Sequence, residues 1–552
     1  MLNKYTFVSL LLSLLFFNSL PLKLKAQYTR QDSLRGSLSP ARSCYDVFYY
    51  DLNVRVVPEK KFIKGHNDIY FTATTDFSTL QIDLFEAMKI NTITDAKGNP
   101  LVFKREGNAT FITFATPITK GTQTWIRVSY EGEPRVAINA PWDGGFSWAE
   151  DAKKRTWIGV SCEGLGASVW YPNKDHLSEE PDSMRIACEV PKALTCVING
   201  NLYSTTPLTD DYVRYDWRVS YPINNYNVSL NIGYYAHFSD TYQSPQDGST
   251  LALDYYVLDY NLEKAKTHFQ QVKPMLECYE KFFGKYPFWR DGFALIETPY
   301  LGMEHQSGIA YGNNYLKGYR NYDLTGTGIG LLFDYLIIHE TGHEYWGNNV
   351  GCYDHAELWI HESFCTYSEA LYIECLYGKE KADAYIKGYQ SIIENDKPII
   401  GDLGVNGEGS GDMYSKGANV LHTLRHYIDN DPIWFDILKG LQKDFALQMI
   451  DTKTVINYIN QKTGKDFNSF FQQYLYETQP PVLEYSIKKK GEKYLFTYSW
   501  NVAVKDFAMP LIVKVGNQVM RLEASATQKT ISLSAEPILQ RQWQYYNVVE
   551  KK

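Results

Sequence analysis

The sequence predicts a multidomain α+β protein, with an antiparallel β domain first, a mainly helical domain second and a small β module last. The chain of 552 residues is longer than one hydrophobic core usually supports, so several domains are expected. Residues 45–238 contain short runs that alternate between polar and apolar side chains, which is typical of half-buried strands. Apolar residues then recur at three- and four-residue steps to about residue 475, and the alternation returns after Pro480.

The N-terminal β domain is expected over residues 27–245. Its strand-like runs are rich in Tyr, Val, Ile and Thr, and they include YYDLNVRVVP, NDIYFTATT, TFITFATP, TWIRVSYEG and NVSLNIGYYAHF. The helical domain is expected over residues 246–478, where LEKAKTHFQQVKPMLECYEKFFG shows the helical period. Residues 479–552 follow a Gln-Pro-Pro break and contain EYSIKKK, KYLFTYSWNV, PLIVKVG and TISLSA, which predict a small β-sandwich-like module.

The first residues carry the pattern of an export signal. Lys4 precedes an apolar run over residues 7–20, which is short for a membrane span, and Ala26 offers a small residue at a cleavage point. Leu24 is large for its place two residues before Ala26, which leaves a retained membrane anchor as the alternative. We expect residues 1–26 to be a signal peptide, and the protein to be periplasmic, on the cell surface or extracellular, with no transmembrane helix after cleavage.

Charge and cysteine content narrow the classes of partner. The chain has 55 basic and 63 acidic residues and no block of Lys or Arg, which argues against nucleic acid or an anionic membrane as a partner. A peptide, a protein or a small molecule is the expected substrate. The eight cysteines include no CxxC pair, and Cys188 with Cys196 is a candidate disulfide, although the sequence does not assign the pairing.

The stretch HETGH carries the chemistry, and it lies in LLFDYLIIHETGHEYWG, which is predicted to be a helix because its apolar residues from Leu332 onward recur at helical spacing. A helix would place His339 and His343 one turn apart on the same face, where both imidazoles reach one ion, with Glu340 between them. Two histidines that merely solvate a helix are the alternative. Glu362 follows after 18 residues, enough for a loop and a returning helix, and it completes a set of two histidines and one carboxylate that is typical of a hydrolytic zinc site.

This donor set predicts a reaction as well as an ion. A zinc ion lowers the pKa of a water molecule and polarises a carbonyl, while Glu340 can take the water proton and return it to a leaving amine. The oxyanion that forms needs a further hydrogen-bond donor. Glu357 and Glu369 either orient the histidines or are solvated helix residues.

At these residues the sequence resembles the M1 family of zinc aminopeptidases, the gluzincins of the aminopeptidase N and leukotriene A4 hydrolase kind. HETGHEYWGN and LWIHESF match the family's zinc motifs. The resemblance implies a thermolysin-like catalytic domain with one zinc ion held by His339, His343 and Glu362. It also implies a short form of the family, because the large helical C-terminal domain of many members is not found after the β module, and we therefore expect an open cleft.

The stretch YLGMEHQ resembles the family's exopeptidase motif. Gly302, Met303 and Glu304 match that motif, whereas Leu301 and His305 depart from it and put the shape of the pocket in doubt. The resemblance implies an edge strand that holds the substrate backbone, with Glu304 on the free α-amine. A carboxylate there makes a free N-terminus part of the recognition.

Two further motifs complete the resemblance. SCEGLGASVWYP resembles the segment that sends an acid into the cleft, which would be Glu163, although a surface loop acid is the alternative. MYSKGANVLHTL resembles the family's YxKGA helix start, which makes Tyr414 the candidate oxyanion donor, with a packed tyrosine as its alternative.

We therefore expect an exported zinc aminopeptidase that removes single residues from peptides with a free N-terminus. Three alternatives remain: an endopeptidase on the same zinc set, an epoxide hydrolase of the leukotriene A4 hydrolase kind, and an inactive family member that serves as a binding module. Glu304 and Glu163 disfavour the first, no specific signal supports the second, and the complete set of zinc and base residues disfavours the third.

Overall fold

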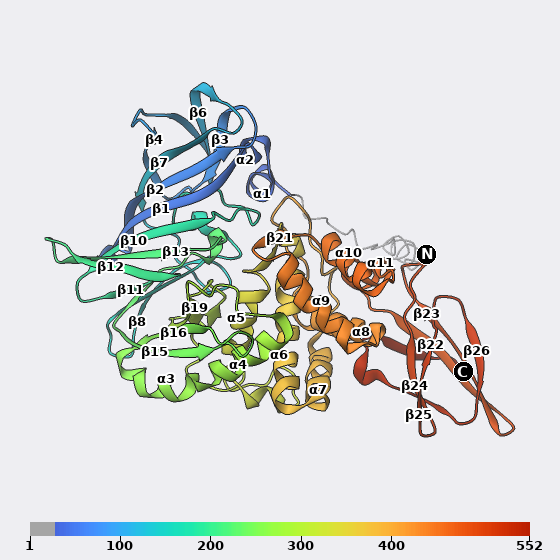
Figure 1. The fold of residues 1–552 in the computed structure, drawn as a ribbon. Coiled ribbons are helices and arrows are strands. Elements are labelled where there is room, and N and C mark those ends of the chain that lie inside the picture. The colour runs from blue at the N-terminus through green and yellow to red at the C-terminus, as the bar shows by residue number, and fades with distance from the viewer. Residues whose placement is uncertain (1–27) are drawn as a thin grey trace, which may run out of the picture.

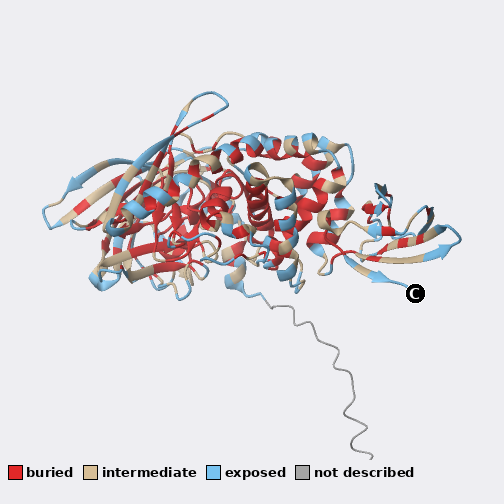
Figure 2. Ribbon diagram, turned by 90° about the horizontal axis from the view of Figure 1, so that it is seen from below, coloured by how far each residue is buried: buried red, intermediate tan, exposed pale blue. Residues whose placement is uncertain are grey.

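The computed structural model describes residues 28–552, so the predicted signal peptide at residues 1–26 lies outside the described part of the chain. Three parts follow one another in sequence order, from a β-rich end through a helical centre to a strand-rich end (Figure 1). This order agrees with the order that the sequence predicts. The helical centre is the most thoroughly buried part, and the C-terminal strands are more exposed (Figure 2).

The N-terminal part begins with helices α1 (Arg30–Gly36) and α2 (Pro40–Ser43) and is built around a seven-stranded sheet. The strands of this sheet, in spatial order, are β12 (Asn201–Pro207), β13 (Tyr212–Val219), β10 (Ser183–Pro191), β1 (Tyr45–Val57), β2 (Phe62–Ala73), β7 (Gln123–Gly132) and β4 (Lys89–Asp95). All neighbours are antiparallel except β1 and β10, which run parallel. The expectation of a purely antiparallel domain is therefore corrected at this pair, whose register joins segments too far apart in sequence for local alternation to reveal.

Two smaller sheets complete this part. One contains β3 (Phe77–Asp83), β6 (Ala109–Ile118) and β5 (Val102–Glu106), and the other contains β11 (Thr195–Val197), β14 (Asn231–Gly233), β9 (Thr156–Ser161) and β8 (Gly145–Glu150). Strand β9 ends at Ser161, two residues before Glu163, and so directs the loop that carries this acid.

A five-stranded sheet introduces the helical part. Its spatial order is β15 (Tyr235–Gln243), β16 (Thr250–Leu258), β17 (Phe293–Glu297), β19 (Ile309–Tyr311) and β18 (Gly302–Met303). Strands β15 and β16 form an antiparallel pair, and the turn that joins them contains residues 245 and 246, where the sequence predicts a domain boundary. The short edge strand β18 carries two of the residues that the resemblance assigns to the substrate backbone.

The helical part contains α3 (Leu262–His268), α4 (Val272–Phe283), α5 (Tyr335–Tyr345), α6 (Trp359–Tyr377), α7 (Lys379–Tyr389), α8 (Asp412–Ile428), α9 (Asp431–Asp444), α10 (Thr452–Thr463) and α11 (Asn468–Phe471). A parallel pair, β20 (Val350–Cys352) and β21 (Gln448–Ile450), ties the loop after α5 to the segment before α10. Helix α8 approaches α6 closely, because a Cβ on Gly417 would lie 1.9 Å from Ser363 Oγ. A glycine at this position therefore brings the two helices together.

Helix α5 begins later than the sequence pattern suggests. Leu332 belongs to a short 3₁₀ turn and Phe333 is extended, so the helix starts at Tyr335. The reason is a side-chain cap: Asp334 Oδ1 accepts a hydrogen bond from the Leu336 amide at 3.0 Å. The other carboxylate oxygen, Oδ2, lies 2.7 Å from His268 Nε2 and accepts a hydrogen bond from the Tyr311 hydroxyl, and these contacts fix the start of the helix in the core.

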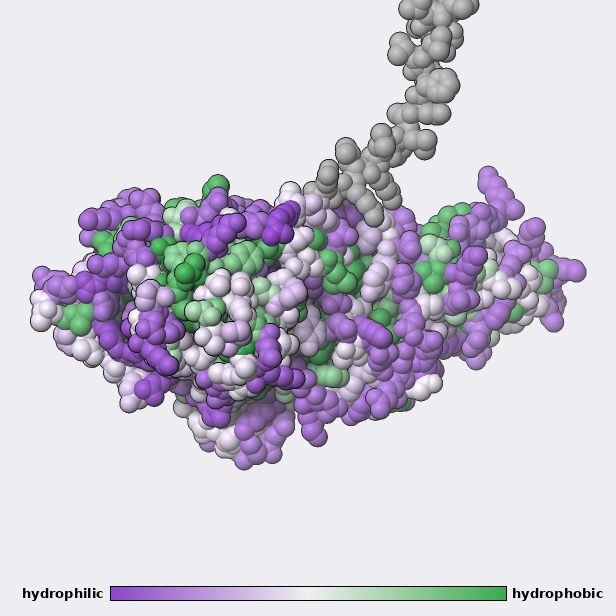
Figure 3. Space-filling model, turned by 90° about the horizontal axis from the view of Figure 1, so that it is seen from above, coloured by the Kyte–Doolittle hydropathy of each residue, from purple (hydrophilic) through white to green (hydrophobic). Residues whose placement is uncertain are grey.

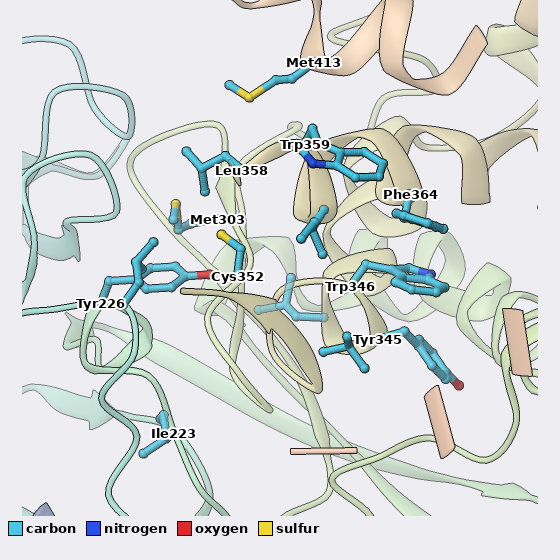
Figure 4. Close-up of a cluster of buried hydrophobic side chains, with 14 of the residues drawn as sticks. Ile223, Tyr226, Met303, Tyr345, Trp346, Cys352, Leu358, Trp359, Phe364 and Met413 are labelled. Atoms are coloured by element: carbon cyan, nitrogen blue, oxygen red, sulfur yellow. The ribbon is translucent and has the colours of Figure 1, made fainter. Parts of the chain in front are cut away.

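A buried apolar cluster packs against α5 and α6. Trp346, just after α5, stacks on Phe364 of α6 with ring centroids 4.2 Å apart. Figure 4 shows both rings in a cluster that also takes in Trp359 and Met303. Helix α5 is buried from Leu336 to Tyr345, and packing against its neighbours therefore sets its position.

The C-terminal module contains two sheets. The first has the order β26 (Lys529–Leu533), β23 (Lys493–Asn501), β22 (Val482–Lys490) and β28 (Asn547–Glu550), and the second has the order β25 (Gln518–Leu522), β24 (Leu511–Val515) and β27 (Pro537–Leu539). A 3₁₀ turn, η10 (Arg541–Trp543), precedes β28 and contacts both α7 and α8.

The cysteines pair differently from the candidate in the sequence. Cys278 of α4 and Cys375 of α6 form a disulfide, whereas Cys188 and Cys196 are free and buried. Proximity in sequence suggested the wrong pair, because the bond joins two helices that become neighbours only in the fold.

The surface has no single apolar face in the view of Figure 3, where hydrophilic side chains separate the hydrophobic ones. Among residues 28–552, no helix is long and apolar enough to cross a bilayer.

Candidate metal centre

Helices α5 and α6 bring together the three residues that the sequence predicts as metal ligands. His339 Nε2 lies 3.6 Å from Glu362 Oε2, and His343 Nε2 lies 3.4 Å from the same oxygen. All three side chains are buried. Two imidazole nitrogens and a carboxylate oxygen therefore converge on one point, as the one-turn spacing of the histidines requires.

This donor set fits a zinc ion. Glu362 Oε2 is buried and has no hydrogen-bond partner within the described residues. Around a tetrahedral ion with ligands about 2.1 Å away, neighbouring ligands are about 3.4 Å apart, which agrees with both histidine–glutamate distances. Cys365 also comes near the histidines, but its thiol donates a hydrogen bond to the His339 carbonyl at 2.8 Å. The nitrogen and oxygen donors therefore form the better ligand set.

Contacts on the far side of each ring fix the histidines. His339 Nδ1 lies 2.8 Å from Glu369 Oε1, and His343 Nδ1 lies 3.0 Å from the Trp346 carbonyl. With Nδ1 held in this way, Nε2 of each ring is left to face the ion. Glu369 thus has the orienting position that the sequence suggested, whereas Glu357 accepts a hydrogen bond from the Thr452 amide and does not contact either histidine.

Glu340 lies beside the three candidate ligands and lines a cavity. The cavity has a volume of about 500 Å³, and His339, Glu340 and Tyr414 line it. Burial raises the pKa of Glu340 to about 7, against the opposing influence of the two histidines. A Cβ on Gly302 would meet Glu340 Oε1 at 2.9 Å, so the absence of a side chain at Gly302 gives this carboxylate its room.

Tyr414 also lines this cavity. It stands in the first turn of α8, and its ring stacks over the His339 ring with centroids 6.2 Å apart. Its side chain is 36% exposed, unlike the packed tyrosine that is the alternative interpretation. Desolvation at the hydroxyl end of this partly exposed residue and the charge of Glu362 raise its pKa well above the ordinary value, so the hydroxyl keeps its proton and can donate it in a hydrogen bond.

Glu304 is the second acid of the centre. One donor atom from each of Glu304, Glu340 and His343 lies within 4.8 Å of the others. The Glu304 side chain is 3% exposed and accepts a hydrogen bond from the Tyr226 hydroxyl at 3.2 Å. Burial raises its pKa, and His343 opposes that rise. A buried carboxylate is thus held next to the metal ligands.

Glu163 approaches the same place from the N-terminal part. Burial raises its pKa well above the usual range, and the charge of Glu304 raises it further. Its Oε1 atom is buried without a hydrogen-bond partner among the described residues. The two acids thus repel each other, and a cation between them would relieve both.

The two departures from the motif differ in position. Leu301 lines the cavity beside Glu340. His305 is fully buried, neither ring nitrogen has a partner in residues 28–552, and burial lowers its pKa to about 3. Leu301 therefore alters the cavity wall directly, while His305 lies behind it.

Three tyrosines that support the centre were not found from the sequence. Tyr226 bonds to Glu304, and the hydroxyls of Tyr385 and Tyr389 donate to Glu369 Oε2 at 2.7 and 2.8 Å. Among 44 tyrosines none of these stands in a motif, so no local signal distinguishes them.

Known proteins resemble this chain in sequence and in fold. Residues 267–474 match the family model described as Peptidase family M1 domain. A leucyl aminopeptidase of Saccharolobus solfataricus is 22% identical over 380 residues, which is 66% of this chain and 47% of that protein. An aminopeptidase N of Streptomyces lividans is 23% identical over 346 residues, which is 58% of this chain and 38% of that protein. The chain thus spans less than half the length of these relatives.

Solved structures share the fold. An M1 zinc metallopeptidase of Deinococcus radiodurans, in a mutant form bound to a Tyr-Ser-Ala substrate, aligns with a TM-score of 0.64 at 18% identity and covers 79% of this chain and 95% of that one. An aminopeptidase A of Legionella pneumophila, in complex with aspartic acid, aligns with a TM-score of 0.76 at 15% identity and covers 92% of this chain and 60% of that one.

Proposed function

We propose that this chain, which belongs to the M1 peptidase family by its domain at residues 267–474, is an aminopeptidase that hydrolyses the first peptide bond of peptides with a free N-terminus. Zinc is the cofactor of the family, and the two histidines with Glu362 are the residues that would hold it. Bound there, zinc supplies Lewis acidity and a water of lowered pKa.

Glu340 and Tyr414 are proposed to transfer protons and to stabilise the oxyanion, respectively. Glu340 takes a proton from the attacking water as general base and then returns it to the leaving amine as general acid. Its place at the cavity wall, with its pKa raised to about 7, supports both roles. Tyr414 donates its hydroxyl to the developing oxyanion, which its position over the His339 ring supports.

The observation that carries the exopeptidase proposal is the pair of acids beside the metal ligands, of which Glu304 is buried and Glu163 is half-buried. Glu304 lies within 4.8 Å of Glu340 and His343, and its charge acts on Glu163. An α-ammonium group bound between these carboxylates would meet a fixed negative charge and would place the first peptide bond at the centre. The backbone of Gly302 and Met303, on edge strand β18, would hold the substrate chain.

The test compares a peptide that has a free amine with its N-acetylated form, each with and without a zinc chelator. We expect cleavage of the free-amine peptide alone, release of single residues, and loss of activity with the chelator. Similar rates on both peptides would replace the proposal with an endopeptidase. A profile over aminoacyl fluorogenic substrates would then define the preferred first residue.

The finer features of the organisation are also proposals. We propose a thermolysin-like catalytic domain at residues 246–478 between a β domain at 27–245 and a β-sandwich-like module at 479–552. The two sheets of the C-terminal module support the last of these. We further propose an exported protein with a signal peptide at residues 1–26, which the apolar run near the N-terminus supports. Fractionation of cells that express the full chain would test this location.

A further inference from the structure

A second group of two histidines and a carboxylate lies where the helical part meets the C-terminal module. His422 and His426 are four residues apart on α8, and Asp383 lies on the neighbouring helix α7. One donor atom from each lies within 4.8 Å of the other two. His422 Nε2 is 3.4 Å from Asp383 Oδ1, and the two imidazole rings are 4.7 Å apart at 72°.

The donor atoms of this junction cluster are buried and unsatisfied. Both ring nitrogens of His422, Nε2 of His426 and Oδ1 of Asp383 have no hydrogen-bond partner in the part of the chain that the structure describes. His422 is only 4% exposed. A buried polar atom without a partner destabilises the folded state. One atom from each of the three side chains converges at this place, and an ion bound there would satisfy these three together.

Geometry and charge both suit a metal ion. The 3.4 Å separation of His422 Nε2 and Asp383 Oδ1 equals the His343–Glu362 separation at the first centre and the edge of a tetrahedral zinc site, about 3.4 Å. Each histidine offers one ring nitrogen to the cluster, and a neutral imidazole presents a lone pair that can bind an ion.

The positive side chains near the cluster are Arg425, Lys379 and Arg521, and each forms an ion pair, that of Arg521 being with Asp429 at 3.4 Å. Arg425 is bound by Glu374 at 2.6 Å and by Asp431 at 2.7 Å, and Lys379 lies 3.5 Å from the same aspartate. A divalent cation at the cluster would therefore meet the charge of Asp383 and not an unpaired arginine.

Trp543 of η10 orients the cluster from the C-terminal module. Its indole N–H donates to Asp383 Oδ2 at 2.9 Å, which leaves Oδ1 to face the histidines. Its ring stacks on His426 with centroids 5.6 Å apart and planes 19° apart. Hydrogen bonds and stacking on the far side of a ligand side chain hold that side chain in the orientation that metal binding needs.

We propose that Asp383, His422 and His426 hold a divalent transition-metal ion of the zinc class, and that this ion fastens the C-terminal module to α7 and α8. Two imidazoles and one carboxylate are ligand types that zinc takes. Thr423 follows His422 where Glu340 follows His339, so the site lacks a base for hydrolysis and its role is structural. The chain would then hold two metal ions instead of the one that the sequence predicts.

Metal analysis of the full-length protein tests this site. After loading with Zn²⁺ and dialysis, we expect two equivalents in the wild type and one in each of Asp383→Asn and His426→Gln. Glu362→Gln is expected to hold one, and its combination with Asp383→Asn none. The matched control is His237→Gln, because His237 and Asp254 form a histidine–carboxylate pair 2.7 Å apart that lacks a second histidine. It should keep two equivalents.

A thermal measurement separates this site from the catalytic one. In the Glu362→Gln protein, added Zn²⁺ should raise the melting temperature, and Asp383→Asn should abolish that rise. Asp383→Asn alone should change the rate on an aminoacyl substrate less than about twofold, because the junction cluster does not line the catalytic cavity. One equivalent in the wild type, or equal metal content in wild type and Asp383→Asn, would overturn the proposal. A wild type that holds two equivalents but has no peptidase activity would refute the proposed function alone.

Discussion

The two clusters of histidines and a carboxylate in this protein share a plan and differ in their surroundings. In each, one helix carries the histidines four residues apart and a neighbouring helix supplies the carboxylate, with a nitrogen–oxygen distance of 3.4 Å. The cluster on α5 and α6 opens onto a cavity of about 500 Å³, whereas Trp543 stacks against the cluster on α7 and α8. Histidine spacing on a helix thus provides ligands for a metal ion in both places, and the neighbouring residues determine whether chemistry can follow.

The neighbours that matter are a base and an oxyanion donor. Glu340 and Tyr414 both line the cavity beside the first cluster. At the junction the corresponding neighbours are Thr423, which donates its hydroxyl to the Asn419 carbonyl, and Tyr367, which packs against the His422 ring. Substitutions at these four positions therefore separate metal binding from catalysis.

The largest effect is expected from Glu340→Gln. This change keeps the size of the side chain but removes the group that carries the proton, so kcat should fall by about 10³-fold or more. The zinc content should be unchanged, because His339, His343 and Glu362 are untouched. Turnover and metal content are measured on the same preparation, and activity near that of the wild type would end the proposed mechanism.

Tyr414→Phe should have the next largest effect. Loss of one oxyanion donor typically lowers kcat by about 10²-fold, with a smaller change in KM. The matched change at the junction, Tyr367→Phe, should leave kcat within about twofold, because its hydroxyl is buried without a hydrogen-bond partner in residues 28–552 and does not line the cavity. Equal losses of kcat in the two variants would show that Tyr414 acts through packing.

Glu369→Gln should weaken metal binding at the first cluster only. The Glu369 carboxylate lies 2.8 Å from His339 Nδ1 and accepts hydrogen bonds from two tyrosine hydroxyls. Loss of its charge therefore loosens the imidazole ring that would face the ion. The expected loss of zinc affinity is about 10- to 100-fold. Titration with a competing chelator measures it, and an unchanged affinity would mean that packing alone holds the ring.

The sequence predicted the ligands of the first cluster because they lie in one compact motif and on the helix that follows. It placed the start of that helix at about Leu332, since periodicity does not register the cap that Asp334 forms. The parallel pair of β1 and β10 and the disulfide of Cys278 with Cys375 depend on contacts between distant segments, and local patterns do not report them. The sequence also contains HTLRH, with His422 and His426 four residues apart. These histidines indicate a metal site only together with Asp383, which lies on another helix and is brought close by the fold.

The smallest effect, and the most specific to the junction, is expected from Trp543→Phe. The indole N–H that holds Asp383 Oδ2 comes from a residue 160 positions along the chain, so its loss leaves both ligating helices intact. Phenylalanine keeps an aromatic ring against His426 but removes the hydrogen bond.

Zinc affinity at the junction should fall by about tenfold, the lower end of the range for groups that orient a ligand from outside, while kcat and the zinc affinity of the first cluster stay the same. Chelator titration of the Glu362→Gln background reports the junction ion alone. If the junction affinity were unchanged, the C-terminal module would be packed beside the ion without being coupled to it. A fall in that affinity with catalysis preserved would show that one arrangement of two histidines and a carboxylate serves here for chemistry in one place and for attachment in another.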